Sequence, residues 1–115
     1  MLLEVNCMAR KKLETLTEQM YYVLLSLTGA ERHGYGIMQN VSELTGGRVN
    51  VGAGTLYALL GRFEGDKLIE RTREVEGRKY YTLTGEGRKV LTEEYERLRR
   101  QVADGARILE GGNRT

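Results

Sequence analysis

The 115-residue sequence contains no proline, no tryptophan, one cysteine and one histidine. Without proline, no position in the chain lacks the backbone donor that a helix interior needs. A single cysteine excludes a disulfide within the chain and is typical of a reducing compartment. One cysteine and one histidine are also too few for an ordinary Cys/His zinc site. We therefore expect neither a metal nor another cofactor.

Long apolar runs are also missing. The longest, residues 20–27, includes Ser26 and is far shorter than the ~20 residues that cross a bilayer. The first eight residues have neither a positively charged start nor a long apolar stretch, which argues against a signal peptide. The sequence therefore predicts a cytoplasmic protein without a membrane partner.

Composition and length indicate one folded domain. Hydrophobic residues make up 40% of the chain and charged residues 30%, as in globular proteins. The formal net charge of +2 is unevenly spread, with −1 in residues 1–47 and +3 in residues 48–100. Any contact with a polyanion is therefore expected in the second half of the chain.

Apolar residues recur at spacings of three and four in three stretches, the pattern of a helix with one buried face. The predicted helices cover residues 15–28, 37–44 and 55–63. Thr15 and Glu18 have the spacing of a capping box at the start of the first helix. Residues 33–36 form a turn before the second helix, and residues 49–51 form at most a brief extended segment.

Two segments that are partly β-branched and aromatic, residues 68–73 and 79–83, predict a hairpin turned by Glu76-Gly77. Because side chains alternate along a strand, Arg71 and Arg73 are expected to share one face.

The predicted hairpin is rich in basic and aromatic groups. Its neighbouring residues Tyr80 and Tyr81 should face opposite ways, so that one packs inward and the other offers its hydroxyl outside. Arg71, Arg73, Arg78 and Lys79 give the hairpin its basic character. Two interpretations of these cations remain open: contact with phosphates, or salt bridges to the hairpin's own glutamates on a solvated surface.

The last predicted helix, from residue 86 to about residue 110, is the longest. Its seam has heptad spacing with a glycine defect at Gly105, and a small domain's own core does not need so regular a seam. A second copy of the chain is the simplest partner, which predicts a homodimer. The expected interface residues are Leu13, Leu16 and Met20 of the first helical region with Leu91, Tyr95, Leu98, Val102 and Leu109 of the last helix.

Three short helices, a hairpin and a final helix follow one another in the order of a winged helix-turn-helix, a mainly α (α+β) fold with a two-stranded wing. A helix of this kind fits the DNA major groove, and arginines on a hairpin can lie along phosphates. The expected parts are an N-terminal extension with partial helical character (1–14), the winged domain (15–84), the long dimerisation helix (85–110) and a frayed tail (111–115).

The start of the third helix is made of small residues, which let backbone N–H groups approach a phosphate. The hydroxyl groups of Thr55 and Tyr57 could bind a phosphate or a base. Alternatively, residues 52–54 form only a turn and Tyr57 is half-buried core, which is the more common outcome for such a tyrosine taken alone.

Together these segments make the chain resemble the PadR family of transcriptional regulators. The similarity covers roughly residues 15–100 and is carried, in the family's order, by HGYGI at 33–37, GTLYALL at 54–60, RFE at 62–64, LI at 68–69, and RKYYTLT at 78–84 with Gly87. Each segment is weak alone, whereas the Gly-Thr-Leu-Tyr and Arg-Lys-Tyr-Tyr segments at this separation form a specific pair.

The resemblance implies a dimeric winged-helix repressor of the subfamily with one C-terminal helix. Its third helix would lie in the major groove and its wing would touch the DNA backbone. These roles map to Gly54, Thr55 and Tyr57 for the helix, and to Arg78, Lys79 and Tyr80 for the wing. Arg62, Arg71 and Arg73 complete the expected DNA-binding residues.

The chain also departs from the family's pattern. Gly36, Gly52 and Ala58 stand where the family has an acidic residue, a nearby serine and a proline, so the operator sequence is not predicted. Some members bind flat aromatic or cationic drugs between the C-terminal helices, often through tryptophan. Here Tyr95 and Met20 could line such a space for a small aromatic or hydrophobic effector, or simply pack in the interface.

Other function classes fit the sequence less well. Two glycines, Gly52 and Gly54, suggest a dinucleotide-binding loop, but the third glycine and a parallel βαβ unit are missing. His33 has no partner in a recognisable catalytic motif, so we expect no enzyme. A winged helix that binds only proteins remains the alternative to a DNA-binding regulator. A coiled-coil adaptor would explain the last helix but not the hairpin.

Overall fold

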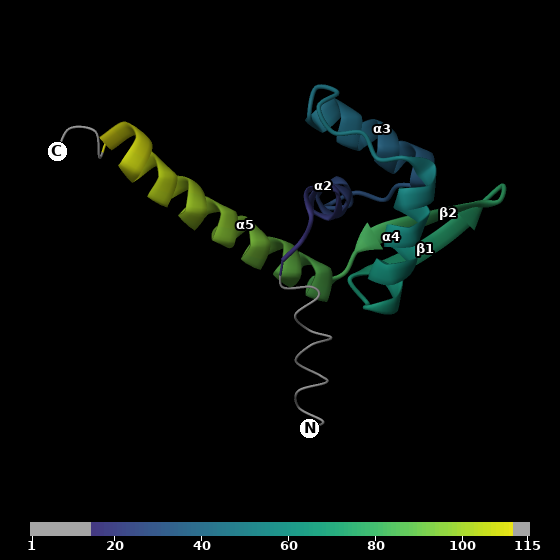
Figure 1. The fold of residues 1–115 in the computed structure, drawn as a ribbon. Helices are drawn as coiled ribbons and strands as arrows, with labels where there is room; N and C mark the ends of the chain where they lie inside the picture. Colours follow the sequence, from purple (N-terminus) through teal and green to yellow (C-terminus); the bar gives the residue numbers. More distant parts are fainter. Residues whose placement is uncertain (1–14, 112–115) are drawn as a thin grey trace.

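The computed structural model describes residues 15–111. Its elements, in order, are α2 (Glu18–Ser26), α3 (Gly34–Leu44), α4 (Ala53–Gly65), β1 (Ile69–Val75), β2 (Arg78–Leu83), α5 (Gly85–Ala106) and a π-helical turn, η1 (Arg107–Gly111). Three helices, an antiparallel hairpin and a long helix confirm the mainly helical winged helix-turn-helix (Figure 1). The expected N-terminal extension, with Leu13, and residues 112–115 of the expected tail lie outside the described residues.

The starts of α2 and α3 differ from the sequence-based expectation. Thr17, not Thr15, caps α2: its hydroxyl accepts a hydrogen bond from the Met20 amide at 3.2 Å, and the Met20 sulfur accepts one from the Thr17 amide at 3.5 Å. The predicted Thr15–Glu18 capping box is therefore wrong. α3 begins at Gly34, so most of the predicted turn at residues 33–36 is the first turn of this helix.

The hairpin has a two-residue turn in which Glu76 and Gly77 both have positive φ, 52° and 80°. This is the backbone that matches the right-handed twist of paired strands. The Arg32 backbone adds an isolated bridge to the buried Tyr81, with hydrogen bonds of 3.0 and 2.9 Å. The predicted extended segment at residues 49–51 is an irregular loop, because Val49 and Val51 point into the core without pairing to a strand.

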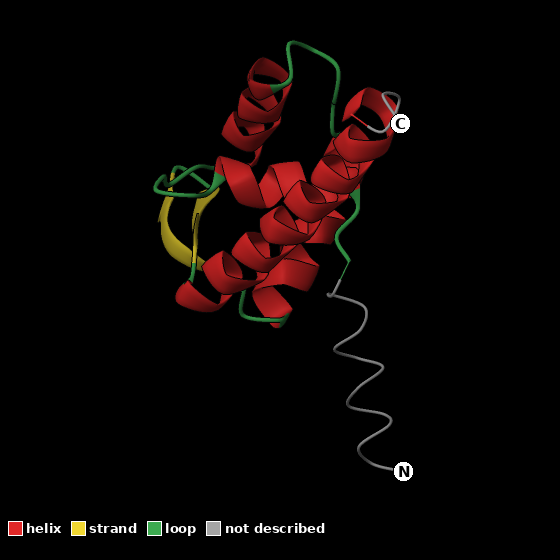
Figure 2. Ribbon diagram, turned by 90° about the vertical axis from the view of Figure 1, so that its left-hand side faces the viewer, coloured by secondary structure: helices red, strands yellow, loops and turns green. Residues whose placement is uncertain are grey.

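The core lies where α2, α3 and α4 meet the hairpin (Figure 2). The largest fully buried apolar side chains are Leu24, Leu27, Ile37, Leu56, Leu60, Phe63, Leu68 and Ile69. Those of α4 are spaced four and three residues apart, as the sequence pattern predicts. The opposite side of α4, with Thr55, Ala58 and Arg62, is therefore turned to solvent.

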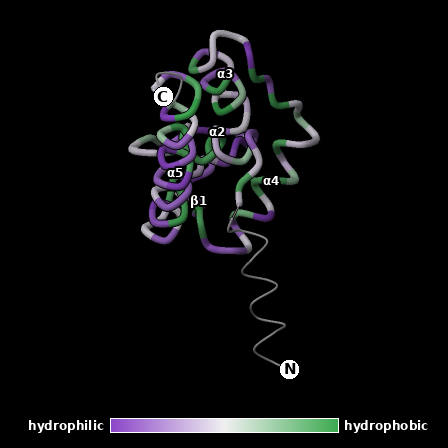
Figure 3. The backbone as a smooth tube through the Cα atoms, turned by 60° about the vertical axis from the view of Figure 1, so that its left-hand side comes forward, coloured by the Kyte–Doolittle hydropathy of each residue, from purple (hydrophilic) through white to green (hydrophobic). Residues whose placement is uncertain are grey.

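Beyond its first turns, α5 leaves the body of the protein (Figure 1). The Cα radius of gyration is 16.7 Å, whereas a compact domain of about 100 residues has about 13 Å. Hydrophilic and hydrophobic segments alternate along α5 (Figure 3). The outer part of the chain's last helical region carries exposed apolar side chains, among them Val102 at 71% and Ile108 at 67%.

Candidate nucleic-acid interface

The outer surface of α4 carries the expected groove-facing residues. Gly54, Thr55 and Tyr57 are all exposed, and the exposed fraction of Tyr57 is 58%. The interpretation of Tyr57 as half-buried core is therefore wrong. Gly52 is the N-cap of this helix and, having no side chain, makes no capping hydrogen bond to its first turn.

A cleft of about 410 Å³ separates the starts of α3 and α4 from the wing. It is lined by His33, Gly34 and Tyr35 of the α3 region, Tyr57 of α4, and Gly77, Arg78, Lys79 and Tyr81 of the hairpin. None of these residues carries a carboxylate, and two are cations. The cleft therefore combines positive charge with hydroxyl and imidazole groups.

Gly34 allows α3 and α4 to meet at this cleft. A Cβ atom at Gly34 would lie 2.7 Å from the Tyr57 hydroxyl oxygen, closer than such atoms can approach. The absence of a side chain at this position therefore lets the Tyr57 ring lie across the start of α3. The outward direction of Tyr57 depends on this glycine.

A β-bulge changes the expected orientation of the wing arginines. Arg71 pairs with Tyr81, but Arg73 pairs with Tyr80, so Thr72 is an extra residue in β1. Because paired residues lie on the same side of a sheet and Tyr80 and Tyr81 face opposite sides, Arg71 and Arg73 also face opposite sides. The expectation that they share one face is wrong, since the bulge breaks the two-residue alternation.

Three arginines of the expected DNA-binding set are paired with carboxylates. The distances are 3.8 Å for Arg62 Nε to Asp66 Oδ2, 3.5 Å for Arg71 Nη2 to Glu64 Oε2, and 2.8 Å for Arg73 Nε to Glu31 Oε1. Within residues 15–111, Arg78 and Lys79 form no such ion pair. The start of β2 thus carries two cations without an ion pair in the described part of the chain, although Glu74 stands opposite Lys79 in the strand register.

Arg73 braces the wing against the α2–α3 loop. Its guanidinium carbon lies 4.1 Å from the centroid of the Tyr80 ring, a cation–π contact. Hydrogen bonds from Thr72 and Arg73 hold the pKa of the Glu31 carboxyl below its usual value. The wing is therefore positioned by its own side chains and is not a loose hairpin.

Tyr81 is the inward-facing member of the tyrosine pair, as expected. Its exposed fraction is 7%. Burial, and then the nearby Glu64 charge, raise the pKa of the Tyr81 hydroxyl, while Arg71 opposes the shift. Tyr80 is only partly buried and contacts the edge of the His33 ring, with the ring centroids 5.1 Å apart.

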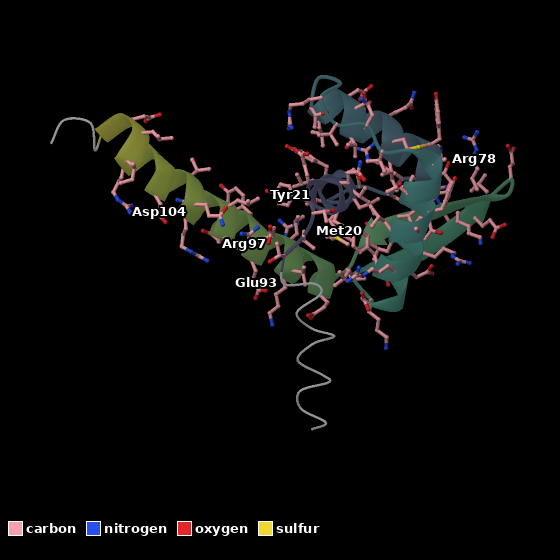
Figure 4. The ribbon with its side chains drawn as sticks, in the orientation of Figure 1. Met20, Tyr21, Arg78, Glu93, Arg97 and Asp104 are labelled. Atoms are coloured by element: carbon pink, nitrogen blue, oxygen red, sulfur yellow. The ribbon has the colours of Figure 1, made fainter. Side chains whose placement is uncertain are left out.

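His33, which local sequence places only in a turn, is not among the residues expected to bind DNA. In the structure it caps α3, since His33 Nδ1 accepts a hydrogen bond from the Gly36 amide at 3.1 Å. The His33 ring also lies in the cleft beside Arg78. Arg78 is labelled in Figure 4. The two residues are 45 positions apart, and no local pattern predicts that they meet.

The residues expected at a dimer interface fall into two groups. Leu16, Met20 and Leu91 are buried in the chain's own core, at 6–7% exposure. Leu98 is partly buried. The exposed fractions of Tyr95, Val102 and Leu109 are 49%, 71% and 74%.

The contact between α2 and α5 is partly polar. Glu94 is buried and accepts hydrogen bonds from Arg97, including one of 3.1 Å from Nε. Burial, and then the nearby hydroxyl of Tyr22, raise the pKa of Tyr21, to which Tyr95 and Glu94 of α5 also contribute. Tyr95 therefore lies near Tyr21, at the edge of this contact.

Within residues 15–111, no group of three or more His, Cys, Asp or Glu side chains is placed to hold a metal ion. The same residues contain no helix long and apolar enough to span a membrane.

Comparison with known proteins places this arrangement in a family. The profile described as "Transcriptional regulator PadR-like family" matches residues 23–93. A PadR family regulator from Eggerthella lenta is 26% identical, with a TM-score of 0.69 and 92% of each chain covered. One from Clostridium difficile is 28% identical, with a TM-score of 0.67 and coverage of 78% of this chain and 96% of that chain.

A third similar structure contains nucleic acid. Bacillus subtilis PadR in complex with operator DNA is 25% identical, with a TM-score of 0.61, and the match covers 67% of this chain and 46% of that one. A search among curated proteins gives no match.

Proposed function

Because this chain belongs to the PadR-like family of transcriptional regulators, we propose that it binds double-stranded DNA as a homodimer and represses transcription. The observation that carries the proposal is the cleft between α4 and the wing. There the exposed Tyr57 lines one cleft with Arg78 and Lys79, which form no ion pair within residues 15–111.

In the proposed complex α4 enters the major groove. Gly54 and Thr55, in its exposed first turns, approach base edges or phosphates, and Tyr57 reaches the backbone through its hydroxyl. Arg78 and Lys79 bind phosphates on the wing side. Arg71 and Arg73 act mainly by holding the wing in position, because each is paired with a carboxylate of the body.

The proposed dimer forms through the exposed seam of α5, chiefly Tyr95, Leu98, Val102 and Leu109. Such apolar positions at heptad spacing need a partner helix to leave water. Two-fold symmetry would place two α4 helices in successive major grooves about 34 Å apart, which implies an inverted-repeat operator.

The proposal also includes a route to release. A small aromatic or hydrophobic effector bound beside Tyr95, between the α5 helices of two copies, would favour dimers in which the α4 helices are misplaced for the operator. The partly polar contact of Tyr21 and Glu94 with this region supports a site there, because ligand sites combine apolar walls with a few polar groups.

The test is selection of bound sequences from a random DNA pool, followed by anisotropy titrations of the selected duplex and a scrambled one at two salt concentrations. A regulator of this kind prefers an inverted repeat, and its affinity falls steeply with salt. Binding that shows no preference at either salt concentration would favour a winged helix that recognises protein.

A further inference from the structure

The contact between His33 and Arg78 lacks an acceptor. His33 Nδ1 accepts the Gly36 amide hydrogen, so the hydrogen of a neutral ring resides on Nε2. Arg78 Nη1 lies 3.3 Å from Nε2, and a guanidinium group can only donate. Two donors therefore lie side by side at 3.3 Å, and an acceptor that approaches both from the open cleft would bind to the pair.

The cleft itself offers tyrosine hydroxyl oxygens as side-chain acceptors. Its lining residues include no carboxylate. The nearby carboxylates of Glu31 and Glu64 bind Arg73 and Arg71 instead. Because Arg78 and Lys79 line the cleft and no carboxylate does, an anion from outside the chain fits it.

The His33 ring is held in place for such a ligand. The amide of Gly36 fixes one ring nitrogen, and the ring stands edge-on to Tyr80 at 5.1 Å between centroids. Tyr80 is in turn covered by Arg73, which Glu31 anchors at 2.8 Å. The Nε2–H group is thus oriented before any ligand arrives, which lowers the entropy that binding costs.

We infer that this cleft holds one phosphate of the DNA backbone, with His33 Nε2–H and Arg78 donating to its oxygens. This inference rests on the proposed function and adds to it a neutral donor, contributed by the start of α3. A phosphate has several oxygens that accept hydrogen bonds, so it can accept from both of these donors.

The test compares His33→Asn with Arg78→Ala on the selected duplex. Asparagine caps a helix as well as most residues do, so α3 keeps its cap, but the shorter side chain does not reach Arg78. We expect His33→Asn to weaken binding about tenfold or more, as loss of a hydrogen bond to a charged group does.

The dependence of DNA affinity on salt distinguishes the charge of Arg78 from the hydrogen bond proposed for His33. Arg78→Ala should weaken binding and lower the slope of log affinity against log salt by about one per protomer, whereas His33→Asn should leave this slope unchanged. Lys89→Ala, which removes an exposed cation of α5, is the matched control and should change neither quantity. An affinity of His33→Asn equal to the wild type would overturn the inference and leave the proposed function intact.

The source of the phosphate is tested by replacing single backbone phosphates with uncharged methylphosphonates. One position per half-site should weaken wild-type binding and have a much smaller effect on His33→Asn. If methylphosphonates at every position weakened binding equally, the proposal that the cleft binds one particular phosphate would be contradicted. Wild-type protein that binds no DNA at all would overturn the proposed function together with this inference.

Because a loss of stability in His33→Asn would also lower its affinity, the contact is also tested by NMR on the wild-type protein. The ¹⁵N shifts of the imidazole ring should show the hydrogen on Nε2 in the free protein and a change at that nitrogen when DNA binds. A hydrogen on Nδ1, or an Nε2 resonance that DNA does not move, would contradict the proposed contact.

Discussion

Gly87, in the first turn of α5, lies so close to the carbonyl oxygen of Leu68 that any Cβ atom would overlap it. The same carbonyl accepts a hydrogen bond from the Thr84 amide at 2.9 Å. The long helix is therefore joined to the start of the hairpin through backbone contacts, with no room for a side chain between them.

Gly87→Ala should destabilise the fold, because the added methyl group meets backbone that cannot move aside. We expect a loss of about 3 kcal/mol in the free energy of unfolding, at the upper end for overpacked sites. Urea denaturation measures it. Gly85→Ala is the matched control, since a Cβ at Gly85 meets no atom within 4 Å.

Gly34→Ala, unlike Gly87→Ala, should lower DNA affinity and leave the stability of the fold nearly unchanged. Here the added methyl group meets the far end of the Tyr57 side chain, which can swing away. Stability should change by less than about 1 kcal/mol, whereas DNA affinity should fall because Tyr57 is displaced. A large loss of stability with unchanged DNA affinity would contradict the proposed role of this contact.

Lys79→Ala should weaken binding to all DNA sequences alike and reduce the salt slope by about one per protomer. Arg71→Ala is the comparison, because the charge of Arg71 is already paired with Glu64, whereas Lys79 has no ion pair within residues 15–111. Its effect on the slope should be small. Anisotropy titrations over a range of salt concentrations measure both slopes.

Val102→Glu should shift the proposed dimer toward monomer without unfolding it, since Val102 is 71% exposed in the single chain. A charge buried between α5 helices should raise the dissociation constant by tenfold or more, which sedimentation velocity measures. Ala103→Glu adds the same charge about 100° around the helix and should have little effect. Equal effects of Val102→Glu and Ala103→Glu would contradict dimerisation through the apolar seam of α5.

Truncation after Arg88 is a less informative test of the dimer, because it also removes Leu91 from the core.

High pH should destabilise the fold through buried tyrosines. The pKa values of Tyr81 and Tyr21 are raised in the folded chain, chiefly by burial, so folding favours their neutral forms. This stability is fully present below the unfolded pKa of about 10 and is lost as pH rises through the folded values. Tyr81→Phe should weaken the pH dependence of the urea midpoint from about pH 8 to about pH 11. A dependence as steep as that of the wild type would show that Tyr81 does not contribute.

Apolar periodicity predicts the three helices of the domain, and a glycine between two strand-like segments predicts the hairpin turn. Leu56, Leu60 and Phe63 are buried because a helix of 3.6 residues per turn brings them to one face. Glu76-Gly77 turns the chain because glycine adopts positive φ readily. These features depend on local geometry, which a single sequence contains.

Other features of the candidate site depend on residues distant in sequence. The bulge at Thr72 has no local sign, and it is stabilised by contacts of β1 with Glu31. Likewise, local sequence places His33 only in a turn, because Arg78, which the hairpin brings to it, is 45 residues away. A pairing of this kind requires the three-dimensional structure.

The backbone junction between Gly87 and Leu68 also makes α5 a lever. Its 22 residues, at 1.5 Å each, give a rigid arm about 33 Å long. Because no flexible linker separates this arm from the winged domain, a turn of about 5° at its far end moves the domain by about 3 Å, roughly the length of one hydrogen bond. In the proposed dimer, a slight rotation where two such helices meet would therefore move each α4 by about the length of a hydrogen bond relative to the DNA.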